Sequence, residues 1–144
     1  MNKPIEVLHI EDDADHVDLV RTAATMAKLP LKINCVPDGE KALQYLRNQD
    51  GFADAVRPDL IILDITLSEM DGWEALKAIR ENPELGKVPI VVLTNRDLPP
   101  TVLKRNSIPH DNLFRKPVGI NGYIQVMKAI GKAYKKQHNA PHLP

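Results

Sequence analysis

A run of four aliphatic residues that ends in a single carboxylate constrains this chain most. Residues 60–63 read Leu-Ile-Ile-Leu, and Asp64 follows them directly. A continuous apolar run of this length is typical of a β-strand buried on both faces, as in a parallel sheet covered by helices. Because burying an unpaired carboxylate costs several kcal/mol, we expect Asp64 at the exposed carboxyl end of the strand. Open parallel sheets build their sites at that end; the alternative is that Asp64 only ends the strand or opens a turn.

The rest of the chain alternates apolar strands with helical patterns. Strands are predicted at residues 5–10, 31–36, 60–66, 89–94 and 112–115. Apolar residues at helical spacing, separated by turn signals, predict helices from residue 15 to Pro30, around 42–46, over 71–82, around 101–106 and over 120–134. Asp71 and Asp97 are expected to cap two of these helices. Five successive strand–helix units indicate an α/β fold, with a parallel sheet flanked by helices.

Length and charge bound the class of protein. The 144 residues suit one domain, and we assign it residues 1–134, followed by a flexible polar tail over residues 135–144. Nineteen basic and nineteen acidic residues cancel, so no general nucleic-acid or membrane surface is predicted. No apolar run approaches the ~20 residues that span a bilayer. The start of the chain resembles no signal peptide, and the single Cys35 favours a reducing cytoplasm.

Polar residues stand where the predicted strands end. Glu11 and Asp12 follow the first strand, Asp64 follows the apolar run of the third, and Thr94 and Lys116 end the fourth and fifth. Because the carboxyl ends of parallel strands share one edge of the sheet, we expect these side chains to converge. The predicted site therefore holds three carboxylates, one hydroxyl and one ammonium.

Such a group of carboxylates calls for a cation. Carboxylates that lie together raise each other's pKa unless a positive charge joins them. Oxygen ligands favour a hard ion, and few protein ligands completed by water suit Mg²⁺. Asp12 and Asp64 are the expected carboxylate ligands, the backbone carbonyl of Thr66 is a third candidate, and Glu11 is expected to act through water.

A cation, an ammonium and a hydroxyl around one carboxylate suit phosphoryl transfer to that carboxylate. An aspartate can act as the nucleophile and become an aspartyl phosphate. The metal and Lys116 would offset charge on the transferring oxygens, and Thr94 would donate a hydrogen bond. The competing interpretation is a salt-bridged loop cluster that carries no chemistry.

Taken together, the motifs resemble a response-regulator receiver domain of two-component signalling over roughly residues 4–134. The matching segments are Ile10-Glu11-Asp12-Asp13, Leu63-Asp64, Met70-Asp71-Gly72, Val92-Leu93-Thr94 and Lys116-Pro117. The resemblance implies a flavodoxin-like sheet of strand order 2-1-3-4-5. It also implies that Asp64 is the phosphoacceptor, Thr94 the switch hydroxyl and Lys116 the contact to the phosphoryl group. A cis peptide between Lys116 and Pro117 is implied as well.

The linkers resemble those of single-domain receivers paired with bacterial phytochromes and related hybrid kinases. Residues 57–60, 82–85 and 87–89 carry this narrower match. It implies a sensor histidine kinase as phosphodonor and a downstream protein or phosphotransfer partner as receiver of the signal. It also implies signalling rather than enzymatic turnover. A homodimer through the face of the fourth helix, fifth strand and fifth helix, helped by Tyr123 and Tyr134, is a further expectation.

Three departures from the family pattern keep other functions open. Ser68 replaces a usual proline, Asn95 stands where a small residue is favoured, and Leu113 occupies the place of the switch aromatic, with Phe114 expected on the opposite face. A phosphorylation-independent interaction scaffold is therefore an alternative. A haloacid-dehalogenase-type phosphatase would need a second aspartate where Thr66 stands. A flavodoxin-like nucleotide binder would need glycines and backbone donors where acids follow the first strand.

Overall fold

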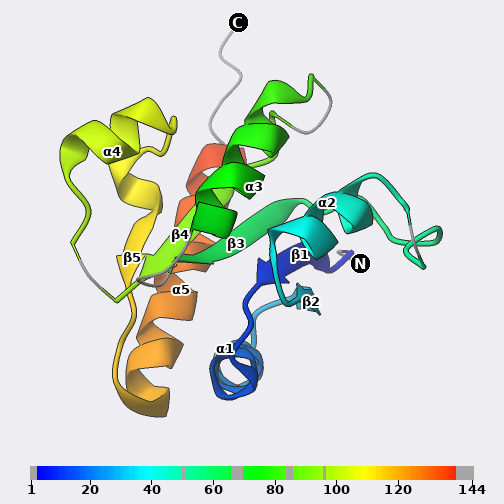
Figure 1. The fold of residues 1–144 in the computed structure, drawn as a ribbon. Helices are drawn as coiled ribbons and strands as arrows, with labels where there is room; N and C mark the ends of the chain where they lie inside the picture. Colours follow the sequence, from blue (N-terminus) through cyan, green and yellow to red (C-terminus); the bar gives the residue numbers. More distant parts are fainter. Residues whose placement is uncertain (1–2, 50, 66–69, 84–85, 96, 139–144) are drawn as a thin grey trace, which may run out of the picture.

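The sheet has the strand order that the family resemblance implies. The computed structural model describes residues 3–49, 51–65, 70–83, 86–95 and 97–138, and its five parallel strands pair in the order β2-β1-β3-β4-β5 (Figure 1). The strands are β1 (Ile5–Ile10), β2 (Leu31–Val36), β3 (Leu60–Ile65), β4 (Ile90–Thr94) and β5 (Leu113–Arg115). The predicted α/β class and the flavodoxin-like order 2-1-3-4-5 are confirmed.

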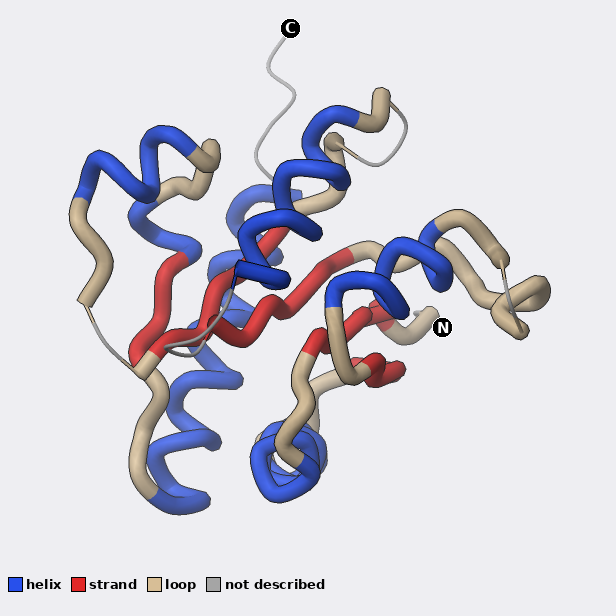
Figure 2. Tube along the Cα trace, in the orientation of Figure 1, coloured by secondary structure: helices blue, strands red, loops and turns tan. Residues whose placement is uncertain are grey.

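Helices cover both faces of this sheet, as Figures 1 and 2 show. They are α1 (Ala14–Met26), α2 (Gly39–Leu46), α3 (Met70–Glu81), α4 (Pro100–Arg105), the 3₁₀ turn η1 (His110–Asn112) and α5 (Gly119–His138). Buried residues of α1 and α5 form one core with the sheet, and those of α2, α3 and α4 form the other. None of the helices in the described ranges is both long and apolar enough to cross a membrane.

Strand β3 contributes to both cores. Leu60 and Ile62 belong to the core beneath α1 and α5, whereas Ile61 and Leu63 belong to the core beneath α2 and α3. All four side chains are at most 2% exposed. This burial on alternating faces explains why the run is continuously apolar. The same alternation separates Leu113 from Phe114, which pack on opposite faces as predicted.

Two predicted helix caps are wrong. Helix α3 begins at Met70, so Asp71 lies inside its first turn rather than before it. Helix α4 begins at Pro100 with Pro99 at the N-cap and no side-chain cap. Asp97 instead pairs with Arg115, whose Nη1 lies 2.6 Å from Asp97 Oδ1. Asp97 thus pairs with the end of β5 instead of capping α4.

Helix α5 is longer than the sequence predicts. It continues to His138, into the segment assigned to a flexible tail, and residues 139–144 lie outside the described part. Tyr123 and Tyr134 are only 2% and 8% exposed, because both pack into the core beneath α1 and α5. They are therefore core residues, and the expectation that they help a dimer surface is wrong.

Asn112 ties the end of α5 to the sheet. Its side chain is 2% exposed, its Nδ2 donates to the carbonyl of Ile90 at 3.0 Å, and its Oδ1 accepts from Gln137 Nε2 at 2.6 Å. Asn112→Ala leaves the buried carbonyl of Ile90 without its partner, whereas Gln137 is exposed and can hydrogen-bond to water. We expect a loss of about 2 kcal/mol in the free energy of unfolding, measured by urea denaturation. Asp111→Ala, at the exposed neighbouring position, is the control and should change it by less than about 0.5 kcal/mol; equal losses would contradict the assignment.

Candidate functional site

Asp64 lies at the carboxyl end of β3, as expected, but its side chain is buried. It is the penultimate residue of the strand, pairs with Leu93 of β4, and its side chain is only 2% exposed. The expectation of an exposed strand end is wrong because the carboxylate has a buried partner. Lys116 Nζ makes an ion pair with Asp64 Oδ2, which offsets the cost of removing that oxygen from water.

Glu11 meets Asp64 from the neighbouring strand. Its backbone N–H donates to the carbonyl of Val36 at 3.0 Å and so continues the β1–β2 ladder by one residue. Its side chain is 1% exposed, and Oε2 accepts from the backbone N–H of Asp13 at 3.3 Å. Asp12 is exposed and lies outside the group of ligand atoms that come together here.

Lys116 directly follows β5, and its side chain contacts both carboxylates. Its backbone N–H donates to the carbonyl of Thr94 at 2.6 Å, and its Nζ lies 3.4 Å from Glu11 Oε1. This side chain is 5% exposed. The peptide to Pro117 is trans, since the described residues contain no cis bond. The implied cis peptide is therefore wrong: the backbone bond to Thr94 orients Lys116 toward the site in the trans form.

The remaining predicted site residues are Thr94 and Thr66. Thr94 ends β4 and is 2% exposed. In the strand register it lies opposite Ile65, the last residue of β3. Thr66 lies outside the described residues.

The site is short of positive charge. Burial and the nearby Glu11 raise the pKa of Asp64 to about 8, against the opposing effect of Lys116. Burial would raise the pKa of Glu11 too, but hydrogen bonding to Asp64 and the charge of Lys116 lower it to about 2. The pKa of Lys116 is raised because its contacts with Asp64 outweigh its own burial. One ammonium thus faces two carboxyl groups, and the Glu11–Asp64 pair holds a shared proton to a higher pH than an isolated carboxyl would.

This electrostatic arrangement fits a divalent cation. Asp64 Oδ1 is buried and accepts no hydrogen bond from the described residues. A cation that replaced the shared proton would supply the missing charge and a partner for that oxygen.

His16 is a member of the site that sequence reasoning missed. It lies in the first turn of α1, behind the Asp13 cap, and its Nδ1 is 3.1 Å from Glu11 Oε1 and 4.0 Å from Asp64 Oδ2. The predicted site contained only residues at strand ends, whereas His16 belongs to a helix. The available signal was the position of His16 in a helix that begins directly after the acidic residues, because a first turn faces back onto the strand end.

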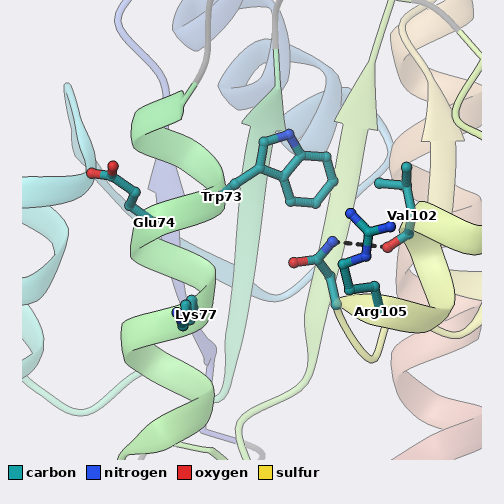
Figure 3. A pocket seen from close by; sticks show the side chains of 6 residues that line it. Trp73, Glu74, Lys77, Val102 and Arg105 are labelled. Carbon is teal, nitrogen blue, oxygen red and sulfur yellow. Dashed lines mark hydrogen bonds between the residues drawn. The ribbon is translucent and has the colours of Figure 1, made fainter.

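A second hollow lies away from this cluster, between α3 and α4. It has a volume of about 370 Å³ and is lined by Trp73, Glu74, Lys77, Val102, Arg105 and Asn106. Figure 3 shows the indole of Trp73 extending from α3 toward Val102 and Arg105 of α4. Trp73 also packs against the core beneath α2 and α3.

Residues 7–128 match the response regulator receiver domain family, and the chain belongs to that family. Members are signalling proteins rather than classical enzymes. The response regulator Rcp1 of Synechocystis is 34% identical over 93 residues, which cover 65% of this chain and 63% of Rcp1. The probable methanogenesis regulatory protein FilR2 of Methanothrix harundinacea is 26% identical over 138 residues, 96% of this chain and 88% of that protein.

Solved structures show the same relationship. The phosphorylated cyanobacterial phytochrome response regulator RcpA superposes with a TM-score of 0.75 at 28% identity, covering 98% of this chain and 99% of that one. The Mn²⁺-bound form of Rcp1 gives the same TM-score at 23% identity, covering 98% of each chain. The chain is therefore a two-component receiver whose relatives include phytochrome response regulators.

Proposed function

We propose that Asp64 accepts a phosphoryl group from a sensor histidine kinase, of phytochrome type or a related hybrid, and that the phosphorylated receiver changes its affinity for a partner. The observation that carries this proposal is the buried contact of Asp64 with Glu11 and Lys116 at the carboxyl end of the sheet. Similarity to Rcp1 and RcpA supports the class of kinase. The reducing compartment suggested by the free thiol of Cys35 would be the cytoplasm.

We assign a divalent-metal site to the same end of the sheet. Asp12 and Asp64 would ligate Mg²⁺ directly together with the carbonyl of Thr66, and Glu11 would act through water. When bound, the ion neutralises charge on the phosphoryl oxygens. The Mn²⁺-bound form of Rcp1 supports a divalent ion in this family.

In the transfer step, a carboxylate oxygen of Asp64 attacks phosphorus as the bond to the donor's imidazole nitrogen breaks. The nitrogen keeps the electron pair of that bond, and the product is a mixed anhydride on Asp64. Lys116 is already within contact of Asp64 Oδ2, so its ammonium can pair with a phosphoryl oxygen without leaving the site. Thr94 would donate a hydrogen bond from its hydroxyl to another phosphoryl oxygen.

The signal would leave through the elements that follow Thr94 and Lys116. Helix α4 follows Thr94 and helix α5 follows Lys116 after short segments, and β5 ends directly before Lys116, so a shift at either residue displaces that face. We assign partner binding, by a downstream protein, a phosphotransfer protein or a second copy, to the face of α4, β5 and α5. Residues 1–134 would form the receiver.

The direct test is the intact mass of the protein after incubation with Mg²⁺ and acetyl phosphate. One added phosphoryl group supports the proposal. Absence of an adduct over a range of times, together with no binding of a beryllofluoride mimic, would favour the scaffold alternative. Two departures from the family pattern support that alternative. Asn95 is exposed, and Leu113 packs in the core where an aromatic switch is expected.

Trp73 offers a second readout. It is the single tryptophan of the chain and borders α4, so a displacement of α4 changes the environment of its indole. We expect beryllofluoride with Mg²⁺ to shift the tryptophan emission of the wild-type protein and to leave that of Asp64→Asn unchanged. An equal shift in both proteins would show that the change does not originate at Asp64.

A further inference from the structure

The distances from the imidazole of His16 to the neighbouring carboxylate oxygens suit a metal ligand. At ~2.1 Å from an ion, neighbouring ligands of an octahedron lie about 3.0 Å apart and opposite ones about 4.2 Å apart. The distance from His16 Nδ1 to Glu11 Oε1 is 3.1 Å, and the distance to Asp64 Oδ2 is 4.0 Å. The imidazole nitrogen and the Asp64 oxygen therefore lie at a separation that suits opposite ligands of one ion, and Glu11 lies close enough to contact that ion through water.

A cation already lies among these three atoms. Lys116 Nζ is 3.1 Å from His16 Nδ1 and 3.4 Å from Glu11 Oε1, and it pairs with Asp64 Oδ2. The ammonium thus contacts the nitrogen and both carboxylates at once. Nδ1 also lies 3.1 Å from Glu11 Oε1, so this ring nitrogen faces both the ammonium and a carboxylate oxygen. The three groups are consequently arranged around a positive charge rather than only around one another.

We infer that His16 is a nitrogen ligand of the divalent metal site, and that it makes the site prefer first-row transition ions such as Mn²⁺ over Mg²⁺. The inference rests on the metal site of the proposed function. Imidazole binds transition metals well, whereas Mg²⁺ selects oxygen ligands and water. A receiver site made of oxygens alone would lack this contribution.

A purely structural role for His16 makes a different prediction. If the imidazole only hydrogen-bonds Glu11 to fix the start of α1, its removal should affect Mn²⁺ and Mg²⁺ alike. If it ligates the ion, its removal should weaken Mn²⁺ selectively. Loss of an outer-shell partner alone costs about 10–100-fold in metal affinity, so loss of a ligand should cost Mn²⁺ about tenfold or more. Mg²⁺ should change by less than about threefold, because it gains little from imidazole.

The experiment uses the metal-free full-length chain at one fixed pH, with Mn²⁺ and Mg²⁺ titrated separately by calorimetry and Mn²⁺ followed by pulsed EPR. Wild type should show coupling of Mn²⁺ to an imidazole nitrogen, and His16→Ala should lose both this coupling and the Mn²⁺ preference. His110→Ala is the matched control, because that histidine is exposed on η1, and it should behave as wild type.

The outcomes separate this inference from the proposed function. Bound Mn²⁺ without nitrogen coupling in wild type would overturn the role of His16 and leave the phosphoacceptor assignment standing. An unchanged Mn²⁺ to Mg²⁺ affinity ratio in His16→Ala would do the same. If neither ion bound to wild type, the metal site of the proposed function would fail together with the ligand. Because the wild-type spectrum is decisive by itself, the test does not depend on the variant's stability.

Discussion

Asp64→Asn is expected to take up no phosphoryl group from acetyl phosphate in the presence of Mg²⁺, whereas wild type gains one. The amide replaces the carboxylate that the structure holds at the end of β3 against the ammonium of Lys116. An amide oxygen is a far weaker nucleophile than a carboxylate. Glu11 does not take over the role, because its oxygens are held by Asp13, His16 and Lys116. Intact mass measures the result.

Two controls make that experiment specific. Asp18→Asn removes an exposed carboxylate on α1 and should be phosphorylated like wild type. Hydroxylamine should remove the group from wild type, since a mixed anhydride is cleaved by this nucleophile and a phosphate ester is not. Persistent labelling of Asp64→Asn would refute the assignment of the acceptor, and a label that resists hydroxylamine would place it on a hydroxyl.

The sheet and the position of Asp64 at its edge could be predicted because their signals are short-range. A strand covered on both faces must be apolar at every position, so residues 60–63 indicate a central strand without reference to the rest of the chain. The parallel arrangement then brings strand ends together whatever their separation in sequence. Glu11 and Lys116 meet in this way although they lie 105 residues apart.

The features that sequence reasoning missed depend on where one element faces another. His16 looks like any polar residue of an amphipathic helix until the angle of α1 over β1 is known. Asp97 has the pattern of a helix cap, but Arg115 lies within reach only once β4 and β5 are paired. Tyr123 and Tyr134 fit an exposed or a buried stripe equally well, and packing of α5 against α1 decides for burial. Side-chain contacts between elements therefore limited the prediction more than the elements themselves.

Metal affinity is expected to depend steeply on pH, because the cation must displace the proton that Asp64 retains. With the pKa of Asp64 raised to about 8, Mg²⁺ should bind about 100-fold more weakly at pH 6 than above pH 8. At a Mg²⁺ concentration about 100 times the high-pH Kd, the ion should add about 2.7 kcal/mol of stability at high pH and only about 0.4 kcal/mol at pH 6. This corresponds to a rise in Tm of roughly 8 °C against roughly 1 °C.

The metal-free protein should show the opposite trend. The folded state holds a proton on Asp64 that the unfolded chain, with an ordinary pKa of 3.8, has released. Stability without metal should therefore fall as pH rises from about 4 to about 8, and change no further above that range. Glu11 acts at the acid end, where its lowered pKa contributes stability that is lost as pH falls from 4.5 toward about 2.

Calorimetric titration of Mg²⁺ at pH 6 and 8.5, with thermal unfolding in chelator and in Mg²⁺ at both values, checks these opposed trends. The His16→Ala variant tests this assignment, since it keeps the carboxyl of Asp64 and removes the neighbouring imidazole. If Asp64 is the group displaced, the pH dependence of Mg²⁺ binding persists in that variant. Mg²⁺ affinity that is equal at pH 6 and 8.5 would mean that Lys116 keeps Asp64 ionised throughout, and that the ion enters a site already stripped of its proton.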